Sequence, residues 1–164
     1  MKLVKAVTGV LHDHPIFQGL DDATEHFIAD CASLSVFQAG DLIYKEQEAA
    51  EQFFIIRHGR VALEVHAPGQ AGIVVDTLRP GDVLGWSWLI PPYRSNFDAR
   101  ALELTRAISF DARCLRGKME QDPALGYEIY KRMMPLVASR LAASRRQLLD
   151  MYGDPEKRGV ASWR

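Results

Sequence analysis

Residues Pro80–Ala101 read PGDVLGWSWLIPPYRSNFDARA, and this stretch decides which fold the chain adopts. It begins with a Pro-Gly-Asp turn, continues as a short apolar strand and breaks at Gly85. After a stop at Pro91-Pro92 it resumes as a strand that carries Arg94 and Arg100. A short loop that combines glycine, hydroxyl, arginine and aromatic groups supplies what an anion-binding pocket in a β-fold needs. The stretch therefore predicts a β-fold in which this loop forms an anion site.

The sequence on both sides of this loop has the two-residue period of β-strands. In Val61–Val65 apolar residues alternate with Ala62 and Glu64, which predicts one buried face and one solvated face. Similar short segments, rich in β-branched and aromatic residues, are separated by glycine and proline turns. They are Leu42–Tyr44, Phe53–Arg57, Val61–Val65, Ile73–Leu78, Asp82–Leu84, Phe97–Ala101 and Ala107–Phe110. Regular short strands of this kind predict an all-β sandwich, barrel or jelly roll over residues 36–111.

Helical periodicity precedes and follows this β-region. Leu3–Leu11 is apolar at helical intervals, and Asp22–Ser33 begins with a capping box in which Glu25 follows the first residue by three positions. Arg113–Glu120 predicts a short helix, and a longer helix is expected from Pro123 to residue 152. The expected order is therefore helices, β-roll and helices.

The last helix carries an apolar seam at heptad spacing. Pro135 removes one backbone donor and would cost about 3 kcal/mol in a straight helix, so we expect a kink or a break there. The segment before it would pack on the β-roll, and the segment after it would pair with a second copy of the chain. The alternative is that the stripe packs on its own domain. The seam consists of Met134, Val137, Leu141, Ser144, Leu148 and Met151.

Composition limits the class of protein. The 164 residues are 48% hydrophobic and 25% charged, which suits one globular domain, and 20 Lys and Arg balance 21 Asp and Glu. The basic side chains of Arg140, Arg145 and Arg146 are expected to form a solvated helix face. Cys31 and Cys114 lie in apolar segments without metal-ligand spacing, which suits a reducing compartment. Without a signal segment or an apolar run near 18 residues, the chain is expected to be cytoplasmic and not membrane-bound.

The chain offers little for catalysis. Metal-dependent enzymes with a jelly roll need histidines and a carboxylate that project into the barrel from paired strands. His12 and His14 have a ligand-like spacing but precede the β-region, His58 falls in a turn, and His66 is expected to face solvent. No Ser or Cys nucleophile stands beside a recognisable base. We therefore expect a protein that is not an enzyme, with no catalytic residue and no metal.

Three glycine-containing motifs and the segment before them identify a family. FQAGDLIY begins at Phe37, FFIIRHGRV at Phe53 and LRPGDVLG at Leu78, and all three resemble successive motifs of the cyclic-nucleotide-binding domain. HPIFQGL, which begins at His14, resembles the segment that precedes this domain in catabolite-activator-type regulators. The resemblance implies an eight-stranded jelly roll, a double-stranded β-helix, with N-terminal helices and a long C-terminal helix that dimerises.

The resemblance also sets the expected limits of the domain. Residues 1–152 would form it, with helices in 1–35, the β-roll in 36–111 and the C-terminal helices in 112–152, followed by a short tail, 153–164. Regulators of this family carry a winged helix-turn-helix after the long helix, and twelve residues are too few to build one. We therefore expect a stand-alone domain that does not bind DNA directly.

The site residues depart from the family pattern at one position. In the family a glutamate after the glycine binds the ribose hydroxyls, and here Trp86 follows Gly85. An indole only donates hydrogen bonds, so a buried ribose hydroxyl would lose its acceptor at a cost of about 1–3 kcal/mol. Arg94-Ser95 resembles the arginine and hydroxyl pair that holds the cyclic phosphate, and Arg100 is the alternative arginine. The expected ligand-binding residues are Gly85, Trp86, Ser87, Arg94, Ser95 and Arg100.

Two functions follow. The first is a regulatory ligand-sensing domain with altered or lost affinity for cyclic nucleotides, whose signal passes through a C-terminal helix homodimer to an unidentified protein partner. Its ligand would be cyclic AMP, cyclic GMP or another small anion. The second is a constitutive protein-interaction scaffold whose pocket is plugged by Trp86. Both tryptophans, Trp86 and Trp88, are expected on one face of a strand.

Overall fold

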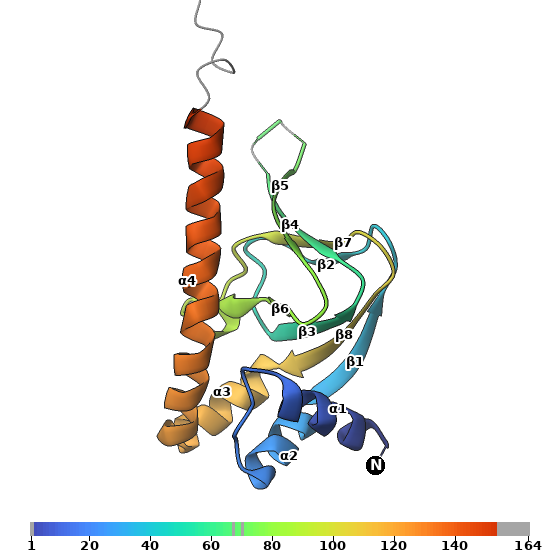
Figure 1. The fold of residues 1–164 in the computed structure, drawn as a ribbon, viewed down its shortest axis with the longest axis vertical. Coiled ribbons are helices and arrows are strands. Elements are labelled where there is room, and N and C mark those ends of the chain that lie inside the picture. Colours follow the sequence, from blue (N-terminus) through green and yellow to red (C-terminus); the bar gives the residue numbers. More distant parts are fainter. Residues whose placement is uncertain (1, 67, 70, 154–164) are drawn as a thin grey trace, which may run out of the picture.

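The computed structural model describes residues 2–66, 68–69 and 71–153. A β-roll stands on three short helices, and one long helix runs along its side (Figure 1). The helices are α1 (Lys2–Asp13), α2 (Asp22–Asp30), α3 (Ala112–Gln121) and α4 (Pro123–Gly153), and the 3-10 turn is η1 (Trp86–Leu89). The strands are β1 (Ala32–Phe37), β2 (Leu42–Tyr44), β3 (Gln52–His58), β4 (Val61–Val65), β5 (Ile73–Leu78), β6 (Val83–Leu84), β7 (Asp98–Ala101) and β8 (Thr105–Asp111).

The eight strands form two antiparallel four-stranded sheets. The strand order is β1-β8-β3-β6 in one sheet and β2-β7-β4-β5 in the other. Apart from β4 and β5, neighbouring strands are distant in sequence, which is the crossed connectivity of a jelly roll. The predicted jelly roll with flanking helices and a long C-terminal helix is confirmed. Strands β2, β4 and β5 also have the predicted bounds.

Strand β3 explains why the chain needs two cores. Its residues Phe53, Phe54, Ile55 and Ile56 are all buried, because each face of the strand meets a different layer. Phe53 and Ile55 pack with the helices in what we call the lower core. Phe54 and Ile56 pack between the two sheets in what we call the barrel core.

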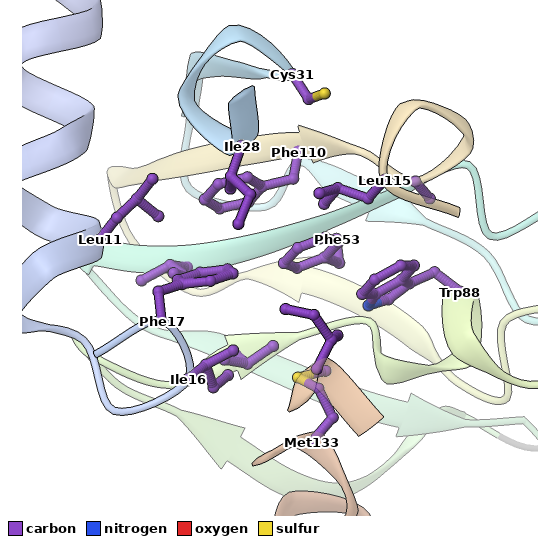
Figure 2. Close-up of a cluster of buried hydrophobic side chains, with 14 of the residues drawn as sticks. Leu11, Ile16, Phe17, Ile28, Cys31, Phe53, Trp88, Phe110, Leu115 and Met133 are labelled. Atoms are coloured by element: carbon purple, nitrogen blue, oxygen red, sulfur yellow. The ribbon is translucent and has the colours of Figure 1, made fainter. Parts of the chain in front are cut away.

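Aromatic rings build the lower core (Figure 2). Trp88 stacks on Phe53 with ring centroids 4.6 Å apart, and Phe53 stacks on Phe110 at 4.7 Å. Phe17, from the segment after α1, meets Phe110 at 5.6 Å. Stacked rings bury large apolar areas in a fixed geometry, so this column fixes the loop that contains Trp88 relative to the sheet.

The first helices differ from the sequence prediction at their ends. Asp21, not Asp22, caps α2, and its carboxylate accepts a hydrogen bond from the Thr24 amide at 3.0 Å. The Thr24 hydroxyl donates a second hydrogen bond to this carboxylate at 2.8 Å, and this bond, followed by that of the amide, lowers the pKa of Asp21. Helix α2 ends at Asp30 instead of Ser33, because the chain pairs from Ala32 onward with β8. The sequence prediction missed this edge strand, β1.

Cys31 and Cys114 form a disulfide that joins the end of α2 to α3. The expectation of two unpaired thiols in a reducing compartment is therefore wrong. The error arose because the two residues are 83 positions apart and show no local pattern. Their Cα atoms lie 6.0 Å apart because β1 and β8, which pair side by side, bring them together.

Helix α4 continues through Pro135 without the expected break. Pro135 is exposed, so its ring lies on the solvent side of the helix. A proline at such a position disturbs no buried contact. In the part of the chain that the structure describes, no helix has both the length and the apolar character that crossing a bilayer requires.

Candidate functional site

The candidate site is the loop from Gly85 to Asn96, which we call the cassette loop. Gly85 adopts φ 91°, a left-handed conformation that residues with a side chain rarely take. This conformation ends β6 and turns the chain into η1. The expectation that Trp86 and Trp88 alternate along a strand is therefore wrong. The reason is the turn at Gly85, after which the tryptophans follow a helical path.

The three residues after Gly85 point into the protein. Trp88 is 1% exposed and belongs to the lower core, and Trp86 is half-buried and packs against the same core. Trp86 therefore contacts the helical side of the sheet and not the barrel core. Ser87 is buried, and its hydroxyl oxygen accepts a hydrogen bond from the Asn96 side-chain amide at 3.3 Å. The indole nitrogen of Trp88 is buried without a hydrogen-bond partner.

The cassette loop pairs with the segment between β2 and β3. The Ala50 amide donates to the Tyr93 carbonyl at 2.8 Å, and the Ser95 amide donates to the Glu48 carbonyl at 2.9 Å. The Gln47 amide returns a bond to the Ser95 carbonyl at 2.8 Å. These bonds satisfy the backbone of both segments, so the loop is held as a short ladder.

Two helices hold the other side of the loop. Arg116 of α3 donates to the Trp88 carbonyl at 2.9 Å, and its guanidinium carbon lies 4.4 Å from the centroid of the Tyr93 ring. Tyr130 of α4 donates its hydroxyl to the Leu89 carbonyl at 2.8 Å. Arg116 and Tyr130, which the sequence alone did not single out, thus connect α3 and α4 to the cassette loop.

Both predicted phosphate-binding arginines have protein partners. Arg94 is exposed and donates to the Gln47 carbonyl at 3.0 Å. Arg100 lies between Ala99 and Ala101, which are fully buried, so it projects from the outer face of its sheet. There it donates to the Glu64 carboxylate at 3.3 Å and to a loop carbonyl at 3.0 Å. The structure therefore directs neither guanidinium into the barrel core.

A cavity of about 440 Å³ lies beside the cassette loop. Tyr44 and Ser95 line it where it meets the loop. The charged residues that line the cavity are Glu48, Glu51, Asp111 and Arg113. Arg113 pairs with Glu51 and so offsets only one of the three carboxylates. The charge balance of this cavity alone does not suit an anion.

A second group of polar residues lies between the barrel core and α4. The ring of Tyr44 packs against the barrel core, and its Cε1 lies 3.7 Å from where a Cβ on Gly85 would stand. Arg140 of α4 forms an ion pair with Asp76 of β5. Arg140 was expected on a solvated helix face; that expectation is wrong, because its side chain is only 18% exposed.

Burial sets the protonation of these groups. Burial raises the pKa of the Tyr44 phenol far above its ordinary value, and the nearby charge of Arg140 only partly opposes this effect. Burial also lowers the pKa of Arg140 below its ordinary value. Tyr44 therefore keeps its proton at neutral pH and remains a hydrogen-bond donor. Neither residue was predicted as a site residue, because they are 96 positions apart and Tyr44 ends an ordinary strand segment.

The predicted seam on α4 is largely solvent-exposed. Leu141 is 72% exposed and Met134 is 46% exposed, while Val137 and Ser144 are half-buried. Tyr127 and Tyr130 extend the same spacing toward the start of the helix and are also exposed. The side chains of Leu148 and Met151 lie outside the described residues. The stripe therefore does not pack fully on its own domain.

One further cluster has metal-ligand chemistry. One ligand atom from each of Glu64, His66 and Asp98 lies within 4.8 Å of the others. Arg100 donates to Glu64, and the Glu46 amide donates to Asp98. The cluster lies on the outer face of the β4–β7 pair and already contains a cation, so a metal ion would compete with Arg100.

Comparisons with known proteins agree with this architecture. The family model described as "Cyclic nucleotide-binding domain" matches residues 34–122. The HTH-type transcriptional regulator Cmr of Mycobacterium tuberculosis is 26% identical over 134 residues, which is 82% of this chain. The CRP-like cAMP-activated global transcriptional regulator of the same species is 24% identical over 136 residues, which is 83% of this chain.

A crystal structure from Geobacter metallireducens GS-15 has the same fold. It superposes with a TM-score of 0.73 at 27% identity, over 82% of this chain and 97% of that chain. By contrast, the chain spans only 53% and 59% of the two regulators. The similarity therefore covers just over half the length of these regulators.

Proposed function

The chain belongs to the cyclic nucleotide-binding domain family, and from this premise we propose that it is a non-enzymatic regulatory domain with altered or lost affinity for cyclic nucleotides. It senses a small ligand beside the cassette loop and passes the signal through α4. Residues 1–152 act as one domain. The matched transcriptional regulators are regulatory proteins, which supports the regulatory part of this role.

The observation that carries the proposal is the residue after Gly85. Trp86 has no acceptor atom for a sugar hydroxyl, and it packs against the lower core instead of the barrel core. Arg94 and Arg100 meanwhile donate to carbonyls of their own chain. A cyclic nucleotide in the family's usual pose would thus lack both its ribose acceptor and a free arginine, and each loss weakens binding.

The output of this domain is a homodimer through α4. The exposed stripe that contains Met134 and Leu141 has heptad spacing and needs an apolar partner, which a second copy supplies. We expect Leu141→Glu to convert a dimer into a monomer in analytical ultracentrifugation, with Ala142→Glu, at an exposed position outside the stripe, as control. A monomeric wild-type protein at micromolar concentration would contradict this output.

A constitutive interaction scaffold is the second candidate. The ion pair between Arg140 and Asp76 favours it, because this pair within the chain ties α4 to β5. In this alternative Tyr44 and the barrel core close the pocket from within, together with Trp86 from the helical side. The dimer surface then works independently of ligand.

Calorimetric titration with cyclic AMP and cyclic GMP separates the two candidates. The proteins are wild type, Trp86→Glu, which restores a carboxylate acceptor, and Trp86→Leu, which removes the indole without adding one. If wild type gives no heat of binding and Trp86→Glu binds a cyclic nucleotide, the result favours the scaffold with a closed pocket. Micromolar binding by wild type excludes the scaffold. Tight binding by wild type that Trp86→Glu does not improve would contradict the altered affinity, and circular dichroism confirms that each variant is folded.

A further inference from the structure

Arg140 differs from the other basic residues of α4 in where its side chain lies. Its side chain is 18% exposed and pairs with Asp76, whereas Arg145 and Arg146 are exposed. A long cationic side chain normally keeps its head group in water, and burial of this one is compensated by the carboxylate. Arg140 is therefore a charged group held between the helix and the β-roll.

Tyr44 is near both Arg140 of α4 and Gly85 of the cassette loop. The charge of Arg140 acts on the Tyr44 phenol, and the ring Cε1 lies 3.7 Å from where a Cβ on Gly85 would stand. The phenol stays protonated at neutral pH. A ligand that enters between α4 and the cassette loop thus meets a guanidinium and a hydroxyl donor, which together suit an oxyanion.

The Asp76 carboxylate is an ion-pair partner of Arg140 that another anion could replace. Its side chain is 32% exposed, and its second carboxylate oxygen accepts a hydrogen bond from the Thr77 amide at 2.8 Å. If the guanidinium leaves, Asp76 keeps this bond and gains water. Release of Arg140 therefore does not strand a buried carboxylate, unlike the breaking of a fully buried pair.

On the basis of the ligand-sensing role proposed above, we propose that Arg140 binds the anionic group of the ligand and that Asp76 occupies Arg140 until the ligand displaces it. The ligand class is a small molecule with an oxyanion, such as a cyclic phosphodiester or a free phosphate. The family resemblance places the anion at Arg94 or Arg100. In the present proposal Arg140 of α4 supplies the cation instead.

This exchange connects ligand binding to the dimer surface. Helix α4 contacts the β-roll at β5 and at η1. Arg140 precedes Leu141, the most exposed apolar residue of the stripe. When Arg140 leaves Asp76, α4 loses its polar link to β5 while Tyr130 still holds it at η1. The helix is then free to turn about its lower contact and reorient the stripe.

Calorimetric titration with cyclic AMP and with inorganic phosphate tests the anion contact. We expect Arg140→Gln to weaken binding by about tenfold or more, Arg140→Lys to retain part of it, and Arg145→Gln to bind as wild type. Asp76→Asn should bind about threefold to tenfold more tightly, because the competing carboxylate is gone. Binding of phosphate alone indicates a free anion as ligand, and binding of cyclic AMP alone indicates a phosphodiester.

Two outcomes overturn the inference in distinguishable ways. Equal affinity of wild type and Arg140→Gln refutes it and leaves the ligand-sensing role intact. No binding of either probe by any variant, Asp76→Asn included, refutes the anion contact of Arg140 and agrees with a loss of cyclic-nucleotide affinity. Hydrogen exchange without ligand gives an independent readout, because Arg140→Gln should raise exchange in β5 and in residues 134–147 of α4, and Arg145→Gln should not. Equal exchange in these two variants would refute the link to Asp76 whatever the titrations show.

Discussion

Replacing Arg116 by methionine should loosen the cassette loop while leaving α3 helical. Arg116 donates to the Trp88 carbonyl at 2.9 Å, which as a charge-assisted bond contributes about 1.5–3 kcal/mol. Its stacking on Tyr93 at 4.4 Å contributes about 0.5–1 kcal/mol. The contact to the Ala50 carbonyl, at 3.5 Å, lies at the limit of a hydrogen bond and is counted as zero. Methionine keeps the apolar stem and forms none of these interactions.

The sum predicts a loss of about 2–4 kcal/mol in the free energy of unfolding. At about 3 °C per kcal/mol for a chain of this size, Tm should fall by about 6–12 °C in differential scanning calorimetry. Hydrogen exchange should rise in the cassette loop more than elsewhere, because that loop loses its anchor.

Arg113→Met is the matched control on the same helix. Arg113 is 71% exposed and pairs with Glu51, which is 51% exposed, so its loss should cost only about 0–1 kcal/mol. If the two variants unfold within about 2 °C of each other, Arg116 does not anchor the loop, and the coupling between α3 and the site is refuted.

Three other predictions concern stability. Gly59→Ala and Gly81→Ala should each lower the free energy of unfolding by about 1–2 kcal/mol, because both positions have a positive φ. At Gly59 the new Cβ would also lie 2.5 Å from a backbone carbonyl oxygen, and this clash should lower the free energy of unfolding by about 2 kcal/mol more, as measured by urea unfolding. Reduction of Cys31–Cys114, which closes a loop of 83 residues, should lower stability by about 4–5 kcal/mol in the chain-entropy model, and unchanged melting with and without reductant would contradict the bond. Burial raises the pKa of Tyr44, so above pH 10 the phenol ionises in the unfolded chain but not in the folded protein. The free energy of unfolding of wild type should therefore fall as the pH rises above 10, and that of Tyr44→Phe should fall less. Equal losses would mean that Tyr44 is solvated.

The sequence predicted the interior strands well because their signal is local. In Ile73–Leu78 the residue types and the flanking turns are sufficient, and the structure has the same bounds. Strand β1 was missed because Leu34 and Val36, both more than half exposed, lie on an edge that pairs only with distant β8. A strand whose partner residues are 68 or more positions away gives no short-range signal.

The sequence located the cassette loop but not the directions of its side chains. The break at Gly85 was expected, but the positive φ of Gly85 decided that Trp86 packs on the lower core. Arg140 and Asp76 are 64 positions apart, and only the fold brings them together. Periodicity and spacing do not predict long-range pairs of this kind. The charge pattern of the last helix predicted only that Arg140 lies on a solvated face.

The Cys31–Cys114 bond has a mechanical consequence. All eight strands, from Ala32 to Asp111, lie within the covalent ring that it closes. A force applied between the two ends of the chain therefore passes through the sulfur atoms and bypasses the sheets. In the oxidised protein only the helices outside the ring can lengthen, and reduction releases about 300 Å of additional extended chain. Single-molecule stretching should thus record the β-roll as a load-bearing element only after the disulfide is cut.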